Sequence, residues 1–136
     1  MEKMQLTYQT IVSPLFAENA YIAHLPESNE CLVIDPGIDP QAILDALEQN
    51  SLQPVAILNT HGHADHIAGN GAIKAAYPTA PLIIGAGDAF KLTDAHANLS
   101  AGYGMPIVSP EADRTVNEPD ILNLAGLELE VLHTPG

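Results

Sequence analysis

Cysteine is almost absent from the sequence, and this scarcity limits crosslinking and thiol chemistry. Cys31 is the single cysteine among 136 residues, so no disulfide can form within one chain. It stands in the apolar run of residues 31–34, where a buried structural thiol is more common than a nucleophile. The sequence therefore predicts neither a disulfide scaffold nor a catalytic cysteine.

Basic residues are also scarce, and their scarcity argues against two classes of partner. Lysine and arginine together number 4 against 17 aspartates and glutamates, which gives a formal net charge of -13 at pH 7. The resulting negative field would repel phosphate backbones and anionic lipid surfaces. We expect no nucleic-acid partner and no membrane partner, and we interpret the charge as an acidic surface that keeps the protein soluble.

Long apolar runs are missing as well. No stretch of about 18 apolar residues could span a bilayer, and residues 1–7 lack the apolar core of a signal peptide. We therefore expect a cytoplasmic protein. Residues 1–136 are long enough for one compact domain with a core, and they contain no internal repeat or linker that would divide it.

Alternating and β-branched residues predict that the chain opens with strands. Three are expected, over residues 4–12, 20–25 and 31–34. A helix follows, which Asp39 caps, Pro40 begins and Asn50 ends. The continuous apolar run of residues 54–59 is typical of a strand that is covered on both faces.

The second half alternates helices with strands. Helices are expected over residues 67–76 and 88–92, strands over residues 81–84, 121–124 and 127–133, and irregular chain over residues 97–113. Asp88 and Asp94 flank the shorter helix, where capping or solvation accounts for both. The irregular stretch is long for a plain connection and could fold over a site. This order of elements predicts an α/β (α+β) fold in which helices flank a mixed sheet.

The segment that carries chemistry follows the apolar run directly. Residues 60–66 read Thr-His-Gly-His-Ala-Asp-His, so their donors lie at the carboxyl end of a buried strand. Imidazole nitrogens and a carboxylate suit zinc, iron(II) or manganese, and no thiolate favours a closed structural zinc site. His61 and His63 can aim the same way from an extended turn, while Asp65 and His66 aim elsewhere. This geometry fits two neighbouring ions better than one.

The motif at residues 60–66 resembles the signature of the metallo-β-lactamase superfamily, and its surroundings are most similar to the glyoxalase II branch of hydroxyacylglutathione hydrolases. Val-Ile-Asp-Pro-Gly at residues 33–37 and Leu-His-Thr-Pro-Gly at residues 132–136 resemble that branch too, in the same order. The resemblance covers essentially the whole chain. It implies the first half of an αββα sandwich and a site for two Zn²⁺ ions, with iron or manganese as alternatives.

The resemblance also assigns roles to individual residues. His61 and His63 would bind the first ion, Asp65 and His66 would bind the second, and Asp35 would stand behind these ligands and orient them. Asp65 would in addition be the catalytic residue. A hydroxide bridging the ions would attack a small-molecule thioester, an S-(2-hydroxyacyl)glutathione such as S-lactoylglutathione, because two cations lower the pKa of bound water and polarise a carbonyl.

Part of the family pattern is not found in these residues. In the family the last motif continues to a second histidine that completes the first metal site, whereas this sequence ends at Gly136. His133 matches the first histidine of that motif, which is not a ligand in the family, and we expect it to be a strand-end residue. Because four of the family's seven ligands are present, we expect a longer native protein or, as the alternative, completion by a second chain in a homodimer.

Other functions remain open on the same scaffold. A persulfide dioxygenase resembles this motif but uses one iron, and lactonase and β-lactamase activities are further alternatives on the same scaffold. The lack of a secretion signal argues against a β-lactamase. The third alternative is a catalytically incomplete fragment that folds, or binds a partner, without turnover.

Overall fold

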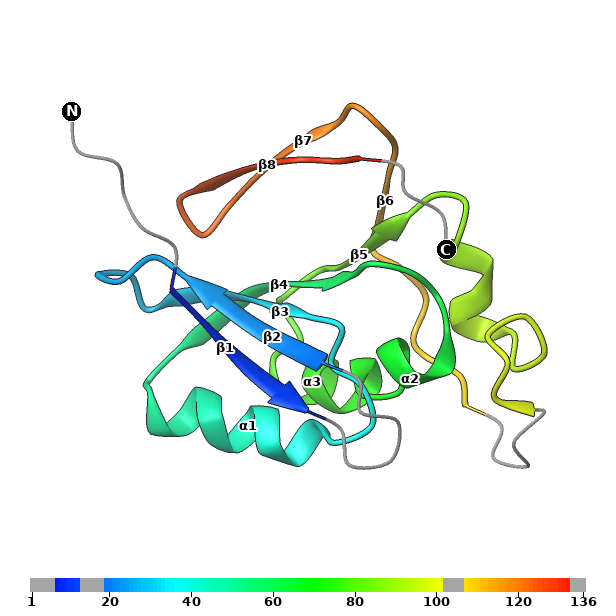
Figure 1. The fold of residues 1–136 in the computed structure, drawn as a ribbon, viewed down its shortest axis with the longest axis horizontal. Helices are drawn as coiled ribbons and strands as arrows, with labels where there is room; N and C mark the ends of the chain where they lie inside the picture. The colour runs from blue at the N-terminus through cyan, green and yellow to red at the C-terminus, as the bar shows by residue number, and fades with distance from the viewer. Residues whose placement is uncertain (1–6, 13–18, 102–106, 133–136) are drawn as a thin grey trace.

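The computed structural model describes residues 7–12, 19–101 and 107–132. A six-stranded sheet in the order β1-β2-β3-β4-β5-β6 forms its centre (Figure 1). Its strands are β1 (Thr7–Val12), β2 (Asn19–His24), β3 (Glu30–Ile34), β4 (Gln53–Asn59), β5 (Leu82–Gly85) and β6 (Arg114–Val116). The first three pair antiparallel, and β3 to β6 pair parallel. The prediction of a mixed sheet is confirmed.

Within the described residues, helical segments connect the strands: α1 (Pro40–Gln49), α2 (Ala64–Ile67), α3 (Asn70–Ala76) and the 3₁₀ helix η1 (Ala89–Thr93). The start of α1 agrees with the prediction from sequence. The Asp39 carboxylate accepts a hydrogen bond from the Ala42 amide at 3.3 Å, and Pro40 occupies the first turn. Ile43 and Leu47 on its inner face are fully buried, so packing as well as capping stabilises this helix.

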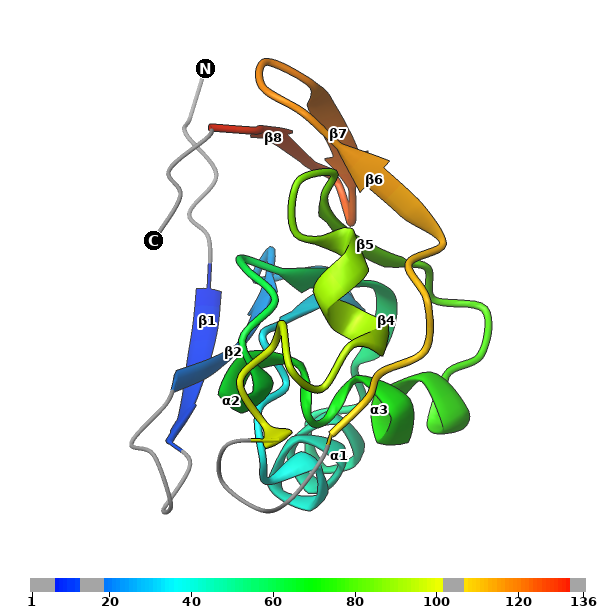
Figure 2. The same ribbon diagram turned by 90° about the vertical axis from the view of Figure 1, so that its right-hand side faces the viewer.

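The sheet is covered on both faces. Helices lie under one face, and the hairpin of β7 (Ile121–Leu124) and β8 (Leu127–Glu130) lies over the other (Figures 1 and 2). Ile57 of β4 belongs to the core on the helical side, and its neighbour Ala56 belongs to the core under the hairpin. This arrangement explains why β4 reads as a continuous apolar run rather than an alternating one.

Cys31 lies on the helical side of β3 and is fully buried. Burial raises the pKa of its thiol to about 12, because an apolar environment disfavours the thiolate. The expectation of a structural cysteine is confirmed. Within the described residues, no helix has the length and apolar character needed to cross a membrane.

Several elements differ from the sequence prediction. The helix expected over residues 67–76 is divided into α2 and α3, because the loop at Gly37 packs against its middle. The Gly37 amide donates to the His66 carbonyl at 3.2 Å, and a Cβ at Gly69 would lie 2.7 Å from the Gly37 oxygen. The segment expected as a helix over residues 88–92 is a 3₁₀ helix.

No element was predicted from the sequence at residues 114–116, which form β6. This strand has three residues, and only Val116 is buried, so no apolar alternation marks it. Its pairing with β5, in the register Ile83 with Arg114, defines it. The last strand ends at Glu130, so it is shorter than the predicted residues 127–133, of which residue 133 lies outside the described residues.

Candidate metal centre

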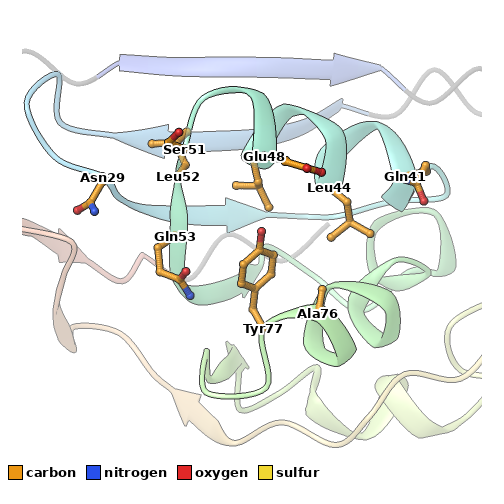
Figure 3. Close-up of a pocket in the computed structure, with 10 residues that line it drawn as sticks. Asn29, Gln41, Leu44, Glu48, Ser51, Leu52, Gln53, Ala76 and Tyr77 are labelled. Carbon is orange, nitrogen blue, oxygen red and sulfur yellow. The ribbon is translucent and has the colours of Figure 1, made fainter.

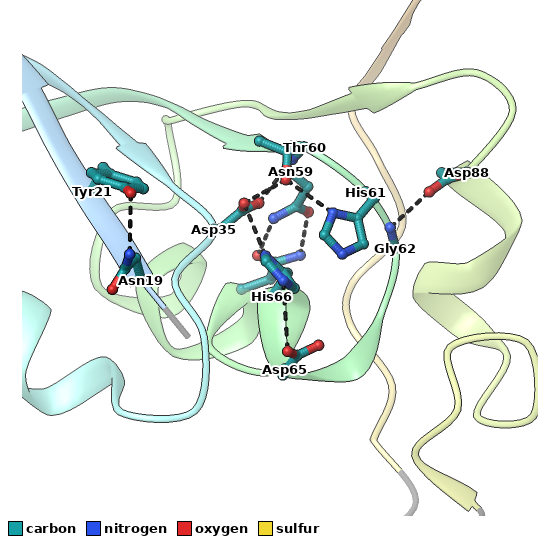
Figure 4. A network of polar contacts seen from close by, with 11 residues as sticks. Asn19, Tyr21, Asp35, Asn59, Thr60, His61, Gly62, Asp65, His66 and Asp88 are labelled. Carbon is teal, nitrogen blue, oxygen red and sulfur yellow. Dashed lines mark hydrogen bonds and ion pairs between the residues drawn. The ribbon is translucent and has the colours of Figure 1, made fainter. Parts of the chain in front are cut away.

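The histidine-rich turn lies where two parallel strands end side by side. Ile34 of β3 is paired with Leu58 of β4, and the Asp35 amide donates to the Leu58 carbonyl at 2.9 Å. Asp35 and Thr60 therefore meet at the carboxyl edge of the sheet (Figure 4). This edge is where open α/β sheets commonly carry their functional groups.

Asp35 is buried and connects the strand edge to α2. Its Oδ1 accepts from the Thr60 amide at 2.8 Å, and its Oδ2 accepts from the Thr60 hydroxyl at 2.5 Å. The same Oδ2 lies 3.0 Å from Nδ1 of His66. Since a carboxylate can only accept, Nδ1 of His66 carries the proton in this network. The backbone of Asp35 has a φ of 50°, a left-handed conformation that these bonds hold in place.

The protonation pattern leaves Nε2 of His66 as the nitrogen with a lone pair, which is the form that binds metal. This nitrogen lies 3.6 Å from Oδ2 of Asp65 (Figure 4). Two ligands about 2.1 Å from one tetrahedral zinc ion stand about 3.4 Å apart. The spacing of this pair therefore fits two ligands of a single divalent ion.

The ring of His61 is held by a hydrogen bond to the hydroxyl of Thr60. Its Nδ1 lies 3.1 Å from the Thr60 hydroxyl oxygen, whose hydrogen points to Asp35, so Nδ1 is the donor. Its ring centroid is 3.9 Å from that of His66 and 4.8 Å from that of His63. Burial, followed by the neighbouring charge of His66, lowers the pKa of His61 below its ordinary value. The neutral imidazole that a metal requires is thus favoured.

The structure gathers His61, His63, Asp65 and His66 on one half-buried turn, as the sequence predicted for their position. In the part of the chain that the structure describes, no three His, Cys, Asp or Glu side chains are grouped so that they could hold one ion together. The donor chemistry fits a divalent ion, and the Asp65 and His66 donors are spaced as two ligands of one ion would be. Metal ligation by these four residues stays a prediction.

Asp88 contacts this turn, although its sequence position predicted a helix cap or a solvated residue. Its Oδ2 accepts from the Gly62 amide at 2.9 Å, and its Oδ1 lies 3.3 Å from Nζ of Lys91. Among the described residues no side chain caps the start of η1, so the capping interpretation of Asp88 is wrong. Burial opposes ionisation, but the Gly62 amide and the Lys91 ammonium outweigh it and lower the pKa of Asp88. Asp94 follows the last residue of η1, and its Oδ1 accepts from the His96 and Ala97 amides of the next turn.

The family model described as Metallo-beta-lactamase superfamily matches residues 14–136. The chain belongs to the metallo-beta-lactamase superfamily. The resemblance of the motif at residues 60–66 is therefore confirmed, and the mixed sheet with helices on one face and a hairpin on the other is the first part of that fold. Proteins of this superfamily bind divalent metal ions.

Relatives include the branch that the sequence resembles. A hydroxyacylglutathione hydrolase from Aeromonas salmonicida is 36% identical over 132 residues, which are 95% of this chain and 43% of that protein. The crystal structure of the BLEG-1 B3 metallo-beta-lactamase has a TM-score of 0.88 and 30% identity, and the match covers 96% of this chain and 62% of that one. TTHA1623 in a di-iron-bound form has a TM-score of 0.71 and 28% identity, with 84% and 56% covered.

The chain spans about half the length of the curated relatives that it matches, 57% of one and 43% of the next. Residues 60–66 lie within the part of the chain that the family model matches. His133, which the sequence predicted to be a strand-end residue, lies outside the described residues.

A second group of polar residues borders the histidine-rich turn at residues 60–66. Asn59 and Asn70 exchange side-chain hydrogen bonds of 3.1 and 2.7 Å, and Asn70 also donates to the Ser109 hydroxyl at 3.0 Å. All three residues are buried. The Asn98 carbonyl accepts from the Ala64 amide at 2.9 Å, so the described part of the irregular stretch 97–113 packs against the turn, as its length suggested.

A groove of about 580 Å³ lies away from the donor cluster, between α1 and α3 (Figure 3). Asn29, which precedes β3, and Gln53, which begins β4, line its end, whereas the donors follow the last residue of β4. Its other walls come from Leu44 and Glu48 of α1 and from Tyr77. Among the described residues, Glu48 and Tyr77 are the only titratable side chains that line the groove, and the histidine-rich turn lies at the opposite end of β4.

Proposed function

We propose that this chain is the metal-binding part of a metal-dependent hydrolase that cleaves the thioester of an S-(2-hydroxyacyl)glutathione. One observation carries the proposal: Asp35 fixes His66 so that its Nε2 stands 3.6 Å from Oδ2 of Asp65, beside the rings of His61 and His63. The name of the Aeromonas salmonicida relative supports the substrate class. The site accounts for hydrolysis without a nucleophilic serine or cysteine.

Two divalent ions, zinc in the first instance and iron or manganese as alternatives, would be held in pairs of ligands. His61 and His63 would hold one, and Asp65 and His66 the other. When bound, such ions lower the pKa of water and polarise a carbonyl oxygen. Asp65, whose side chain is 31% exposed, would also face the reacting centre as the catalytic residue.

The remaining residues of the site would act on proton positions and geometry. Asp35 keeps the proton on Nδ1 of His66, and the Thr60 hydroxyl keeps it on Nδ1 of His61. Both histidines then present Nε2 as the ligand atom. Because the imidazole rings are already held in place, they need to move little when an ion binds, and such preorganisation favours catalysis.

The proposed activity is that of a whole protein of the relatives' length, because this chain spans only about half of them. We propose that the missing ligands are supplied by further chain or, as the alternative, by a second copy in a homodimer. A cytoplasmic location and a small-molecule thioester as the partner stay predictions.

Hydrolysis of S-lactoylglutathione tests the proposal. The reaction should be measured with added zinc for residues 1–136 and for a form extended at the C-terminus to the relatives' length. We expect turnover in the extended form only. Turnover in neither form, with metal bound, would exclude the thioesterase.

β-Lactam hydrolysis is the second candidate, favoured by the TM-score of 0.88 and 30% identity to the BLEG-1 enzyme. A chromogenic cephalosporin assayed beside S-lactoylglutathione separates the two, because a thioesterase should turn over the thioester with a far higher kcat/KM. Oxygen uptake with glutathione persulfide and a single bound iron would instead identify a persulfide dioxygenase.

A further inference from the structure

The peptide between His61 and His63 is fixed by a residue that lies 26 positions away in the sequence. The Gly62 amide donates to Oδ2 of Asp88 at 2.9 Å, and this bond joins the ligand turn to the residue that precedes η1 (Figure 4). Asp35 contacts the amide and hydroxyl of Thr60 and the ring of His66. Asp88 acts on the backbone from which two ligands project.

The space around Gly62 is too small for a side chain. A Cβ at position 62 would lie 2.6 Å from Cβ of Lys91, 3.0 Å from its Cδ, and 3.1 Å from the Asp88 carbonyl oxygen. A side chain there would have to displace η1. Glycine therefore lets η1 approach the turn closely enough for the Asp88 carboxylate to reach its amide.

Lys91 orients the carboxylate for this task. Its Nζ lies 3.3 Å from Oδ1 of Asp88, which leaves Oδ2 directed at the Gly62 amide. The side chains of Asp88 and Lys91 are 29% and 24% exposed, so the pair is partly shielded from water. A charged acceptor makes a stronger hydrogen bond than a neutral one.

We propose that Asp88 is a positioning residue of the metal centre, which holds the Gly62 peptide so that His61 and His63 present their rings to one ion. This inference rests on the proposed function, because it assumes that these histidines bind metal. Asp88 itself touches neither substrate nor ion. Removing it should loosen the turn and weaken metal binding, with the sheet left intact.

Asp113 provides a matched control elsewhere in the protein. Its Oδ2 accepts from the Leu82 amide at 2.8 Å and from Nζ of Lys74 at 2.6 Å. It thus combines a backbone amide and a lysine, as Asp88 does, but it does so at the start of β5, away from the turn. Asp113→Ala removes the same kinds of interaction without touching the centre.

The experiment compares Asp88→Ala, Asp88→Asn and Asp113→Ala in the full-length protein. Co²⁺ is titrated into the metal-free forms against a competing chelator, and its d–d absorption is recorded. Hydrogen exchange of the Gly62 amide is measured in the same metal-free samples. The first readout reports affinity and ligand geometry, and the second reports the hydrogen bond directly.

We expect Asp88→Ala to weaken Co²⁺ binding by about 10- to 100-fold, to alter the absorption spectrum and to speed Gly62 exchange by at least about tenfold. Asp88→Asn keeps an oxygen acceptor and should restore most of the affinity. Asp113→Ala should bind Co²⁺ like the wild type. Equal Co²⁺ affinities for Asp88→Ala and Asp113→Ala would overturn the positioning role of Asp88 but not the proposed function. A wild type that binds no Co²⁺ would overturn the proposed function.

If Asp88→Ala fails to fold, Asp88→Asn and Lys91→Met keep the inference testable. Lys91→Met retains the length of the side chain and removes the charge that orients the carboxylate. Each should bind Co²⁺ more weakly than the wild type, with faster exchange of the Gly62 amide. Unchanged exchange and affinity in both would contradict the positioning role.

Discussion

Replacing Asp35 with asparagine would keep the size of the side chain but would replace one accepting oxygen by a donating NH₂ group. Oδ1 accepts from the Thr60 amide at 2.8 Å, while Oδ2 accepts from the Thr60 hydroxyl and, at 3.0 Å, from Nδ1 of His66. An asparagine whose oxygen faces the amide would present N–H donors to His66. Nδ1 of His66 would then accept, and its proton would move to Nε2, the atom proposed to bind metal.

The expected loss follows from this change of tautomer. Removing a carboxylate that supports a histidine ligand typically costs about 10- to 100-fold in metal affinity, or about 1.4 to 2.8 kcal/mol. We expect Asp35→Asn to bind Zn²⁺ more weakly than the wild type by this amount. Asp45→Asn is the control, because Asp45 is an exposed residue of α1 whose side chain accepts a hydrogen bond from Gln41 at 2.8 Å, away from the turn.

Competition with a fluorescent chelator measures the affinity, and the ¹⁵N shifts of the His66 ring report which nitrogen carries the proton. Wild-type affinity in Asp35→Asn, with the His66 proton still on Nδ1, would refute the reasoning. A loss of the same size in Asp45→Asn would show that the effect comes from charge alone.

Three further predictions concern stability and reactivity. Asn70→Ala removes three buried hydrogen bonds and leaves the Asn59 amide without its partner, so urea unfolding should show a loss of about 3 kcal/mol; a loss below about 1 kcal/mol would contradict the network. The pKa of His61 is lowered in the folded protein, so as the pH falls His61 is protonated in the unfolded chain before it is protonated in the folded one. The contribution of His61 to the free energy of unfolding is therefore present above about pH 6.5 and is lost as the pH decreases. An NMR titration midpoint of His61 at or above about 6.5 in the metal-free protein would contradict this prediction. Cys31, whose thiol has a pKa of about 12, should react with a thiol reagent only after unfolding, and reaction at the rate of a free thiol in the native protein would disprove its burial.

Local sequence signals predicted the elements that depend on local contacts. Asp39 and Pro40 begin α1 because a side-chain cap and a fixed φ act within one turn. The apolar run after Gln53 predicted β4, because a strand covered on both faces needs no polar face. The position of the donor turn followed directly, since it comes immediately after that strand.

Contacts between distant residues determined what the sequence did not reveal. The break between α2 and α3 depends on the approach of Gly37 to Gly69, and β6 exists through its pairing with β5. The contact of Asp88 with Gly62 was missed for the same reason, because no local pattern links the two residues. The only signal in the sequence was Gly62 between two histidines. A glycine there indicates that another segment approaches the backbone closely, but it does not indicate which segment.

The metal content of the full-length protein tests the central claim most directly. Elemental analysis of protein purified with zinc should be compared with that of a His63→Ala, Asp65→Ala double variant, which removes one proposed ligand from each ion. The account predicts close to two equivalents of divalent metal per chain in the wild type and a large loss in the variant. Equal metal content in both, or none in either, would contradict the assignment of the turn at residues 60–66 as a metal centre.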